Sequence, residues 1–200
     1  MRRTLIVFLR APSLGRGKRR LARDIGAVPA LAFQRTQVAC LLRRLGRDPR
    51  WRTMLAVTPD DAVRRRWPIR LPAVAQGRGD LGARMARALA TPPPGAVVLI
   101  GADIPSVTRA DVWSAFRTLG DRDLVLGPAR DGGYWLIGMR RTPRPPPRDF
   151  GKVRWSSRHA LADTLANLGP GRRVAMAATR EDIDDGAAWR RWRALRPTSP

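Results

Sequence analysis

The sequence has almost none of the residues that build disulfide frameworks or imidazole metal clusters. It contains one cysteine, Cys40, and one histidine, His159. A single cysteine excludes a disulfide framework and a cysteine-built zinc site, and a single histidine excludes a cluster of imidazole ligands. Any bound metal ion must therefore be held by carboxylates, which favours a hard cation such as Mg²⁺ or Mn²⁺.

Long apolar runs are also missing. The best run, Ala96 to Ile100, has the length of a strand, whereas a membrane helix needs roughly 18 to 20 residues. Near the N-terminus, the run from Leu5 to Leu9 ends at Arg10, which makes it too short for a signal peptide. With 44% hydrophobic and 28% charged residues, we expect one folded domain over residues 1–200, without a membrane span and in the cytoplasm.

Acidic residues are few, since 16 Asp and Glu stand against 39 Lys and Arg and the net charge is +23. Only Lys18 and Lys152 are lysines, and GC-rich codon use would produce the same arginine bias. Such a surface attracts polyanions non-specifically. Because neither a zinc-finger spacing nor an aromatic RNA-binding strand accompanies the charge, basicity alone gives weak support to a nucleic-acid function.

Apolar runs rich in β-branched residues alternate with segments of helical periodicity. This order predicts an α/β fold: a mostly parallel, Rossmann-like sheet flanked by helices, with a late antiparallel hairpin. Residues 143–147 are expected to form a stiff, polyproline-like segment. The predicted strands are 4–9, 53–57, 70–75, 96–100, 123–126, 134–139 and 174–177, and the predicted helices are 29–45, 80–90, 108–119, 156–168 and 187–195.

The loop after the first predicted strand combines basic residues with glycines. Arg16, Lys18 and Arg20 stand beside Gly15 and Gly17. Glycines let backbone amides approach an anion, and basic side chains neutralise phosphate charge. Sites in parallel sheets lie at the carboxyl ends of the strands, where this loop begins. The pattern favours diphosphate binding, and a solvated basic loop is the alternative.

Asp103 follows the strongest predicted strand directly, within Gly101-Ala102-Asp103. A carboxylate at that edge can hold a divalent cation against the phosphates of a substrate. The alternative is an aspartate that only caps a helix or a turn.

Two further segments carry candidate residues. In Asp131-Gly132-Gly133-Tyr134-Trp135, an ordinary turn explains the first three residues, while the aromatic faces beside a carboxylate suit a sugar or a base. The acidic segment from Glu181 to Asp185 is either part of a site or an electrostatically favourable helix start. Cys40, between apolar neighbours, is expected to be a packed core thiol.

Six motifs occur in order over nearly the whole chain, and together they resemble one bacterial family of uncharacterised GT-A-type glycosyltransferases, some of them linked to arsenosugar biosynthesis. The motifs are Phe8-x3-Pro12-x2-Gly15-x2-Lys18-x-Arg20-Leu21-Ala22, Gly79-Asp80-Leu81-Gly82-x-Arg84-Met85, Ile100-Gly101-x-Asp103-x-Pro105, Gly127-Pro128-x2-Asp131-Gly132-Gly133-Tyr134-Trp135-Leu136-Ile137-Gly138, Phe150 with Trp155-Ser156, and Asp182-Ile183-Asp184.

The resemblance implies a nucleotide-diphospho-sugar transferase fold and a metal-dependent transfer of a sugar from a nucleotide sugar to a small acceptor. It implies Mg²⁺ or Mn²⁺ held by Asp103 and Asp184, less favourably Asp182, and catalytic roles for Asp103 and Asp131. The implied nucleotide- and phosphate-binding residues are Pro12, Gly15, Lys18, Arg20, Asp80 and Arg84, and the implied substrate pocket consists of Gly132, Gly133, Tyr134, Trp135 and Trp155.

The chain departs from the family pattern at three positions. Arg19 stands where threonine is usual, and Asp185 and Ala188 replace the threonine and the aspartate that usually follow the last motif. Two alternatives stay open. One is a nucleotidyltransferase that releases pyrophosphate from an NTP, because cofactor guanylyltransferases of related fold share similar motifs. The other is a catalytically silent or nucleic-acid-binding protein on the same scaffold.

Overall fold

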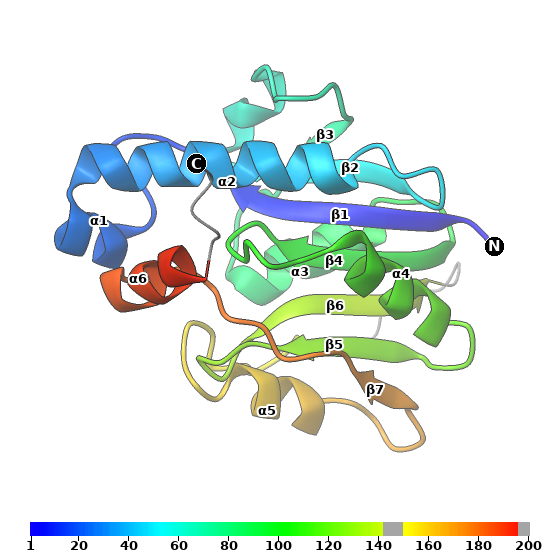
Figure 1. Ribbon diagram of the computed structural model, residues 1–200. Helices are drawn as coiled ribbons and strands as arrows, with labels where there is room; N and C mark the ends of the chain where they lie inside the picture. The colour runs from blue at the N-terminus through cyan, green and yellow to red at the C-terminus, as the bar shows by residue number, and fades with distance from the viewer. Residues whose placement is uncertain (142–149, 196–200) are drawn as a thin grey trace.

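Seven strands form one sheet in the computed structural model, which describes residues 1–141 and 150–195. The sheet has the order β3-β2-β1-β4-β6-β5-β7 (Figure 1). All neighbouring strands are parallel except β6, which is antiparallel to both β4 and β5. The predicted fold class is therefore confirmed. The strands are β1 (Arg3–Arg10), β2 (Arg52–Thr58), β3 (Ala73–Ala75), β4 (Gly95–Gly101), β5 (Leu124–Pro128), β6 (Tyr134–Arg141) and β7 (Val174–Met176).

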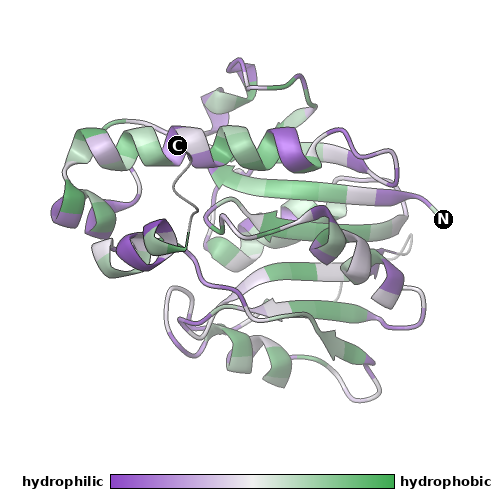
Figure 2. Ribbon diagram, viewed as in Figure 1, coloured by the Kyte–Doolittle hydropathy of each residue, from purple (hydrophilic) through white to green (hydrophobic). Residues whose placement is uncertain are grey.

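The apolar residues of β1 alternate between the two faces of the sheet, as the period of a strand requires. Leu5, Val7 and Leu9 pack in one core cluster, while Ile6 and Phe8 pack in the other. Burial on both faces explains why this strand is a continuous apolar run (Figure 2).

Helices cover both faces of the sheet. In Figure 1, α2 (Ala27–Leu45) and α4 (Arg109–Thr118) cross the nearer face, while α3 (Leu81–Ala90) lies behind the strands. Leu161 and Leu165 of α5 (Ala160–Ala166) pack in the same cluster as α3. A 3-10 helix, η1 (Asp60–Arg64), follows β2. None of the helices in the described residues has the length and apolar character needed to cross a membrane.

Two short helices lie beyond the carboxyl ends of the parallel strands, α1 (Arg19–Ile25) and α6 (Gly186–Ala194) (Figure 1). Leu21 of α1 and Ala188 of α6 pack with Ala30 and Ile183 in a third apolar cluster. This cluster brings the C-terminal segment against the loop that follows β1.

The structure corrects several sequence predictions. Helix α1 replaces part of the predicted basic loop. The predicted helix 156–168 is reduced to α5: Ser156 has a left-handed φ of 57°, which excludes it from a regular helix, and residues 157–159 and 167–168 form turns or bends. The prediction for Cys40 was wrong: it is exposed, because the buried positions of α2 lie on another side of the helix. The segment predicted at 143–147 lies outside the described residues.

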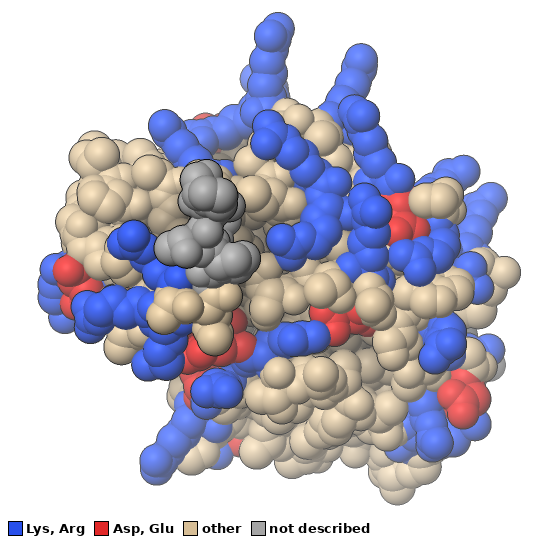
Figure 3. Space-filling model, viewed as in Figure 1, with Lys and Arg blue, Asp and Glu red and all other residues tan. Residues whose placement is uncertain are grey.

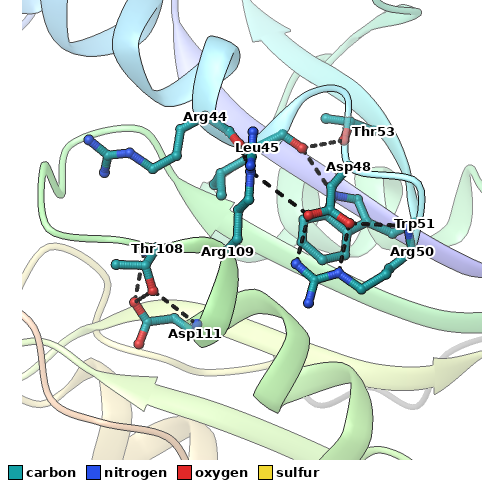
Figure 4. Close-up of polar contacts among 9 residues, drawn as sticks. All are labelled: Arg44, Leu45, Asp48, Arg50, Trp51, Thr53, Thr108, Arg109 and Asp111. Carbon is teal, nitrogen blue, oxygen red and sulfur yellow. Dashed lines mark hydrogen bonds and ion pairs between the residues drawn. The ribbon is translucent and has the colours of Figure 1, made fainter.

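Arg109 at the start of α4 contacts the end of α2 and the Asp48–Arg50 pair that follows it (Figure 4). The buried carboxylate of Asp48 accepts hydrogen bonds from Nε and Nη2 of Arg50 at 2.8 and 2.7 Å, and Arg109 Nε lies 3.9 Å from it. Arg44 donates to the carbonyl oxygens of Pro105 and Val107 at 2.8 and 2.7 Å. The backbone just after Asp103 is thereby held in place from α2.

Candidate active site

The ammonium group of Lys18 lies between two carboxylates that are far apart in sequence. Its Nζ is 3.2 Å from Oδ2 of Asp103 and 3.4 Å from Oδ1 of Asp184. The Lys18 side chain is only 4% exposed, whereas the two aspartates are about half exposed. Arg20 adds a second, looser contact to Asp184 at 3.7 Å. Three of the motifs singled out in the sequence therefore meet at one point.

Backbone geometry produces this meeting. Lys18 precedes α1 in the left-handed conformation, with φ 45° and ψ 40°, so the chain turns sharply between the glycine-rich loop and the helix. On the other side, the chain after β7 continues beside β5, where Arg180 N donates to Pro128 O at 3.0 Å. Ile183 N then donates to Asp103 O at 3.1 Å. That last bond places the Asp182-Ile183-Asp184 motif beside the end of β4.

The environment of Lys18 acts on its pKa in two directions. Burial disfavours the charged form, but the negative charges of Asp103, Asp184 and Asp182 and the hydrogen bond to Asp103 outweigh burial and raise the pKa of the ammonium group. Lys18 is therefore a permanent positive charge at this site.

Two adjoining cavities open on either side of Asp103. The first has a volume of about 340 Å³ and is lined by the basic side chains of Arg10, Lys18 and Arg84 together with Asp184. The second has a volume of about 280 Å³ and contains Asp131 and Asp182. The residues that line both are Leu81, Met85, Gly101, Asp103, Tyr134 and Trp135. A ligand that spans both cavities must pass Asp103.

A buried glutamine, Gln76, positions the Arg84 side chain at the first cavity through a hydrogen bond. Gln76 uses its Nε2 to bond the carbonyl oxygens of Leu9 at 3.1 Å and Ala56 at 2.8 Å, which leaves its Oε1 to accept from Arg84. The guanidinium of Arg84 lies 5.6 Å from the centre of the Phe8 ring. Burial, followed by the charge of Arg10, lowers the pKa of Arg84. The first cavity thus concentrates positive charge that an anionic ligand would compensate.

Backbone constraints explain the glycines beside Asp131. Gly132 has φ +87°, and a Cβ there would lie 2.2 Å from the backbone oxygen of Arg158, so the position requires glycine. Gly133 N donates to Oδ1 of Asp131 at 2.9 Å, which orients the carboxylate at the second cavity. Asp131 therefore both accepts a hydrogen bond within the turn and lines the second cavity.

Aromatic side chains form the wall of the second cavity. Tyr134 and Trp155 meet edge to face with ring centres 6.4 Å apart, and Phe150 supports Trp155 at 6.2 Å. The Trp155 ring nitrogen is buried without a hydrogen-bond partner among the described residues. Burial also raises the pKa of Tyr134, so this side chain stays neutral.

Asp182 is the partly buried carboxylate of the second cavity. Desolvation, and then the charge of Asp131, raise its pKa, while Lys18 lowers it. Negative charge thus accumulates here in a protein that is strongly basic elsewhere.

The residues present fit a hard divalent cation. Asp103 and Asp184 converge on a single cation position, which the Lys18 ammonium contacts here, and both offer the oxygen ligands that Mg²⁺ and Mn²⁺ prefer. Within residues 1–141 and 150–195, His, Cys, Asp and Glu do not form a group of three that could hold a metal. A bound ion would therefore need further oxygen ligands from a substrate or from water, as is usual for Mg²⁺ sites that bind substrate phosphates.

Most of the residues predicted for the site come together, and five do not line either main cavity: Pro12, Gly15, Arg20, Asp80 and Gly132. Lys18, Arg84, Asp103, Asp131, Asp184, Gly133, Tyr134, Trp135 and Trp155 line them. Gly15 lies in the exposed loop with φ +71°, and the carbonyl of the buried Pro12 accepts a hydrogen bond from Arg65. Asp80 is the N-cap of α3 and accepts from Ala83 N at 2.8 Å.

Sequence reasoning gave no site role to several polar residues of the first cavity, among them Gln76 and Arg10. Arg10 is the last residue of β1, so the rule that sites follow strand ends would have found it. Gln76 directly follows the strand predicted at 70–75, of which the structure keeps β3, so the same rule would have found it.

The sequence profile of a family described as uncharacterized proteins conserved in bacteria (DUF2064) matches residues 41–157, more than half of the chain. The chain belongs to this family. The matched segment contains Asp103 and Asp131, whereas Lys18 and Asp184 lie on either side of it. A search of curated proteins finds no match.

Solved structures with the same fold share the arrangement of strands and helices over most of the chain. A protein from Desulfovibrio desulfuricans G20, provisionally assigned as a nucleotide-diphospho-sugar transferase, is 28% identical with a TM-score of 0.84, over 92% of this chain and 84% of that one. Rv0371c from Mycobacterium tuberculosis H37Rv, in a complex with manganese, is 18% identical with a TM-score of 0.54, over 98% and 100%. A CMP:2-keto-3-deoxy-manno-octonic acid synthetase in a complex with CTP is 14% identical with a TM-score of 0.58, over 98% of each chain.

Proposed function

We propose that this protein is a divalent-cation-dependent glycosyltransferase that moves a sugar from a nucleotide-diphosphate sugar to a small acceptor. The observation that carries the proposal is the meeting of two cavities of different charge at Asp103. The likeness to the Desulfovibrio protein supports it. The manganese complex of Rv0371c, whose identity of 18% establishes only a common fold, motivates the choice of Mn²⁺ for the test.

In this proposal the first cavity holds the nucleotide and its diphosphate. Arg10, Lys18 and Arg84 line it, and their positive charges bind the phosphate oxygens and stabilise the negative charge that develops on the departing diphosphate. Asp103 and Asp184 would hold a divalent cation, which would supply further positive charge to the same leaving group.

The second cavity holds the acceptor. Asp131, which Gly133 N fixes through Oδ1, orients an acceptor hydroxyl and accepts its proton. Trp155 and Tyr134 provide apolar faces for the ring of a sugar.

The alternative is nucleotidyl transfer, in which the first cavity takes an NTP and pyrophosphate leaves. The synthetase with bound CTP, which shares the fold, motivates it. The two reactions differ in their products, because glycosyl transfer releases a nucleoside diphosphate from a nucleotide sugar and nucleotidyl transfer releases pyrophosphate from an NTP.

The proposal is tested by measuring both products with a panel of nucleotide sugars and NTPs in the presence of Mn²⁺. We expect release of a nucleoside diphosphate, together with Mn²⁺-dependent binding of UDP or GDP that Asp103→Asn abolishes. Asp121→Asn is the matched control, because Asp121 is 72% exposed and pairs only with Arg122 among the described residues. Pyrophosphate release, or unchanged nucleotide affinity in Asp103→Asn, would contradict the proposal.

A further inference from the structure

The two cavities divide the charges of the site unequally. Three aspartates, Asp103, Asp131 and Asp182, line the second cavity, and none of its described lining residues is a lysine or an arginine. The chain as a whole has 39 basic residues against 16 acidic ones, and basic side chains cover much of the surface seen in Figure 3. A cavity without a basic lining residue is therefore unusual for this molecule.

Two of the arginines close in sequence to the lining residues of the second cavity are engaged elsewhere, and two others, Arg130 and Arg158, are exposed. Arg154, next to Trp155, forms a bidentate pair with Asp163 at 2.8 and 2.9 Å. Arg180, close in sequence to Asp182, pairs with Asp111 of α4. The side chains of Arg154 and Arg180 already have carboxylate partners, so an anionic ligand would have to compete with those partners for them.

Two of the three carboxylates of the second cavity, in contrast, lack a direct cationic partner, although the charge of Lys18 acts on Asp182 from a distance. Asp131 and Asp182 form no ion pair with any described residue, whereas Asp103 contacts Lys18. A divalent cation at Asp103 and Asp184 would also leave these two carboxylates uncompensated. A ligand in this cavity thus meets two negative charges beside the aromatic wall of Tyr134 and Trp155.

We propose that the second cavity takes a polyhydroxyl compound that is neutral or positively charged, such as an amino sugar, and rejects phosphorylated and carboxylated compounds. A cationic amine gains from the carboxylates and from the faces of the aromatic rings, whereas like charges brought together disfavour an anion. The inference rests on the proposed function in assigning this cavity to the acceptor. It also separates the two reactions, since a phosphorylated acceptor, as in nucleotidyl transfer to a sugar phosphate, would not be accommodated.

The test compares three probes with the same ring: D-glucosamine, D-glucose and D-glucose 6-phosphate. The first cavity is filled with a nucleoside diphosphate and Mg²⁺, because its basic residues would otherwise bind the phosphate probe. Binding is followed by the indole N–H signal of Trp155 in ¹⁵N-labelled protein, identified through its loss in Trp155→Phe. Only a ligand near the second cavity shifts that signal.

We expect glucosamine to bind at least as tightly as glucose, and glucose 6-phosphate to bind at least about tenfold more weakly. In Asp182→Asn the advantage of glucosamine over glucose should fall, while in the matched control Asp121→Asn it should persist. Tighter binding of the phosphate, equal responses of the Asn variants, or no shift of the Trp155 signal with any probe would overturn the inference. Failure of the glycosyl-transfer assay would leave this binding result unaffected, so the two proposals fail separately.

Discussion

Replacing Lys18 by methionine should make the protein bind Mn²⁺ more tightly in the absence of nucleotide. The substitution keeps the length and apolar character of a side chain that is only 4% exposed, and removes the charge that lies 3.2 and 3.4 Å from Asp103 and Asp184. Lys18 is thus an internal cation that competes with an external one. Because methionine would face the same left-handed backbone conformation, strain at this position changes little between the two proteins.

The magnitude follows from the exposure of the partners. The carboxylates are 53% and 45% exposed, so solvent screening reduces each interaction to about 1 kcal/mol rather than the larger value of a buried pair. Two such interactions give about 2 kcal/mol, or roughly 30-fold in the dissociation constant of Mn²⁺.

The assay is titration of the nucleotide-free protein with Mn²⁺, with the free ion measured by electron paramagnetic resonance. Arg23→Met is the matched control, because it removes an exposed charge from α1, and we expect it to change the affinity little. Thermal unfolding of each variant verifies that the fold is intact. An unchanged or lower Mn²⁺ affinity in a folded Lys18→Met protein would refute the idea that Lys18 competes for the cation position.

Two further predictions concern stability. Gly132→Ala should lower the free energy of unfolding by more than about 1 kcal/mol, because φ is +87° and the new Cβ would meet the backbone of Arg158. Gly169→Ala is the control and should leave the free energy of unfolding nearly unchanged, because the space around Gly169 is open. Urea denaturation of both variants measures the difference. The pKa of Asp111 is lowered in the folded protein because hydrogen bonds from Thr108 and Arg180 outweigh desolvation. Its stabilisation is complete above the unfolded pKa of about 4 and is lost as the pH falls through the lower folded value, so wild type should lose more stability than Asp111→Asn between about pH 6 and pH 3. Equal losses would refute this assignment.

The sequence predicts the sheet well because its strands are buried on both faces. Runs such as those around Val7 and Val98 must be apolar throughout to occupy that position, and this leaves a strong signal. Helix α1 leaves almost none, since four of its seven residues are charged and only Leu21 is buried. Its existence depends on packing against α2, which follows it directly, and against α6, which is distant in sequence.

The sequence indicates which residues belong to the candidate site, but it does not indicate which of them contact one another. Strand ends place Lys18, Asp103 and Asp131 at one edge of the sheet. The position of Asp184 depends on the path of the chain beside β5 and on the Ile183 hydrogen bond to Asp103, neither of which has a local sequence pattern. Asp80, which the family resemblance assigned to phosphate binding, also has a local structural role as the N-cap of α3, and an aspartate before a helical segment is typical of that role.

Because the hydrogen bond between Ile183 and Asp103 positions Asp184, the site can be completed only after the acidic segment from Glu181 to Asp185 has been synthesised. During translation, six of the seven strands leave the ribosome well before the acidic segment does. Until that segment arrives, Lys18 has only one of its two carboxylates. The nascent polypeptide can therefore assemble most of its β-structure while the candidate site is still incomplete.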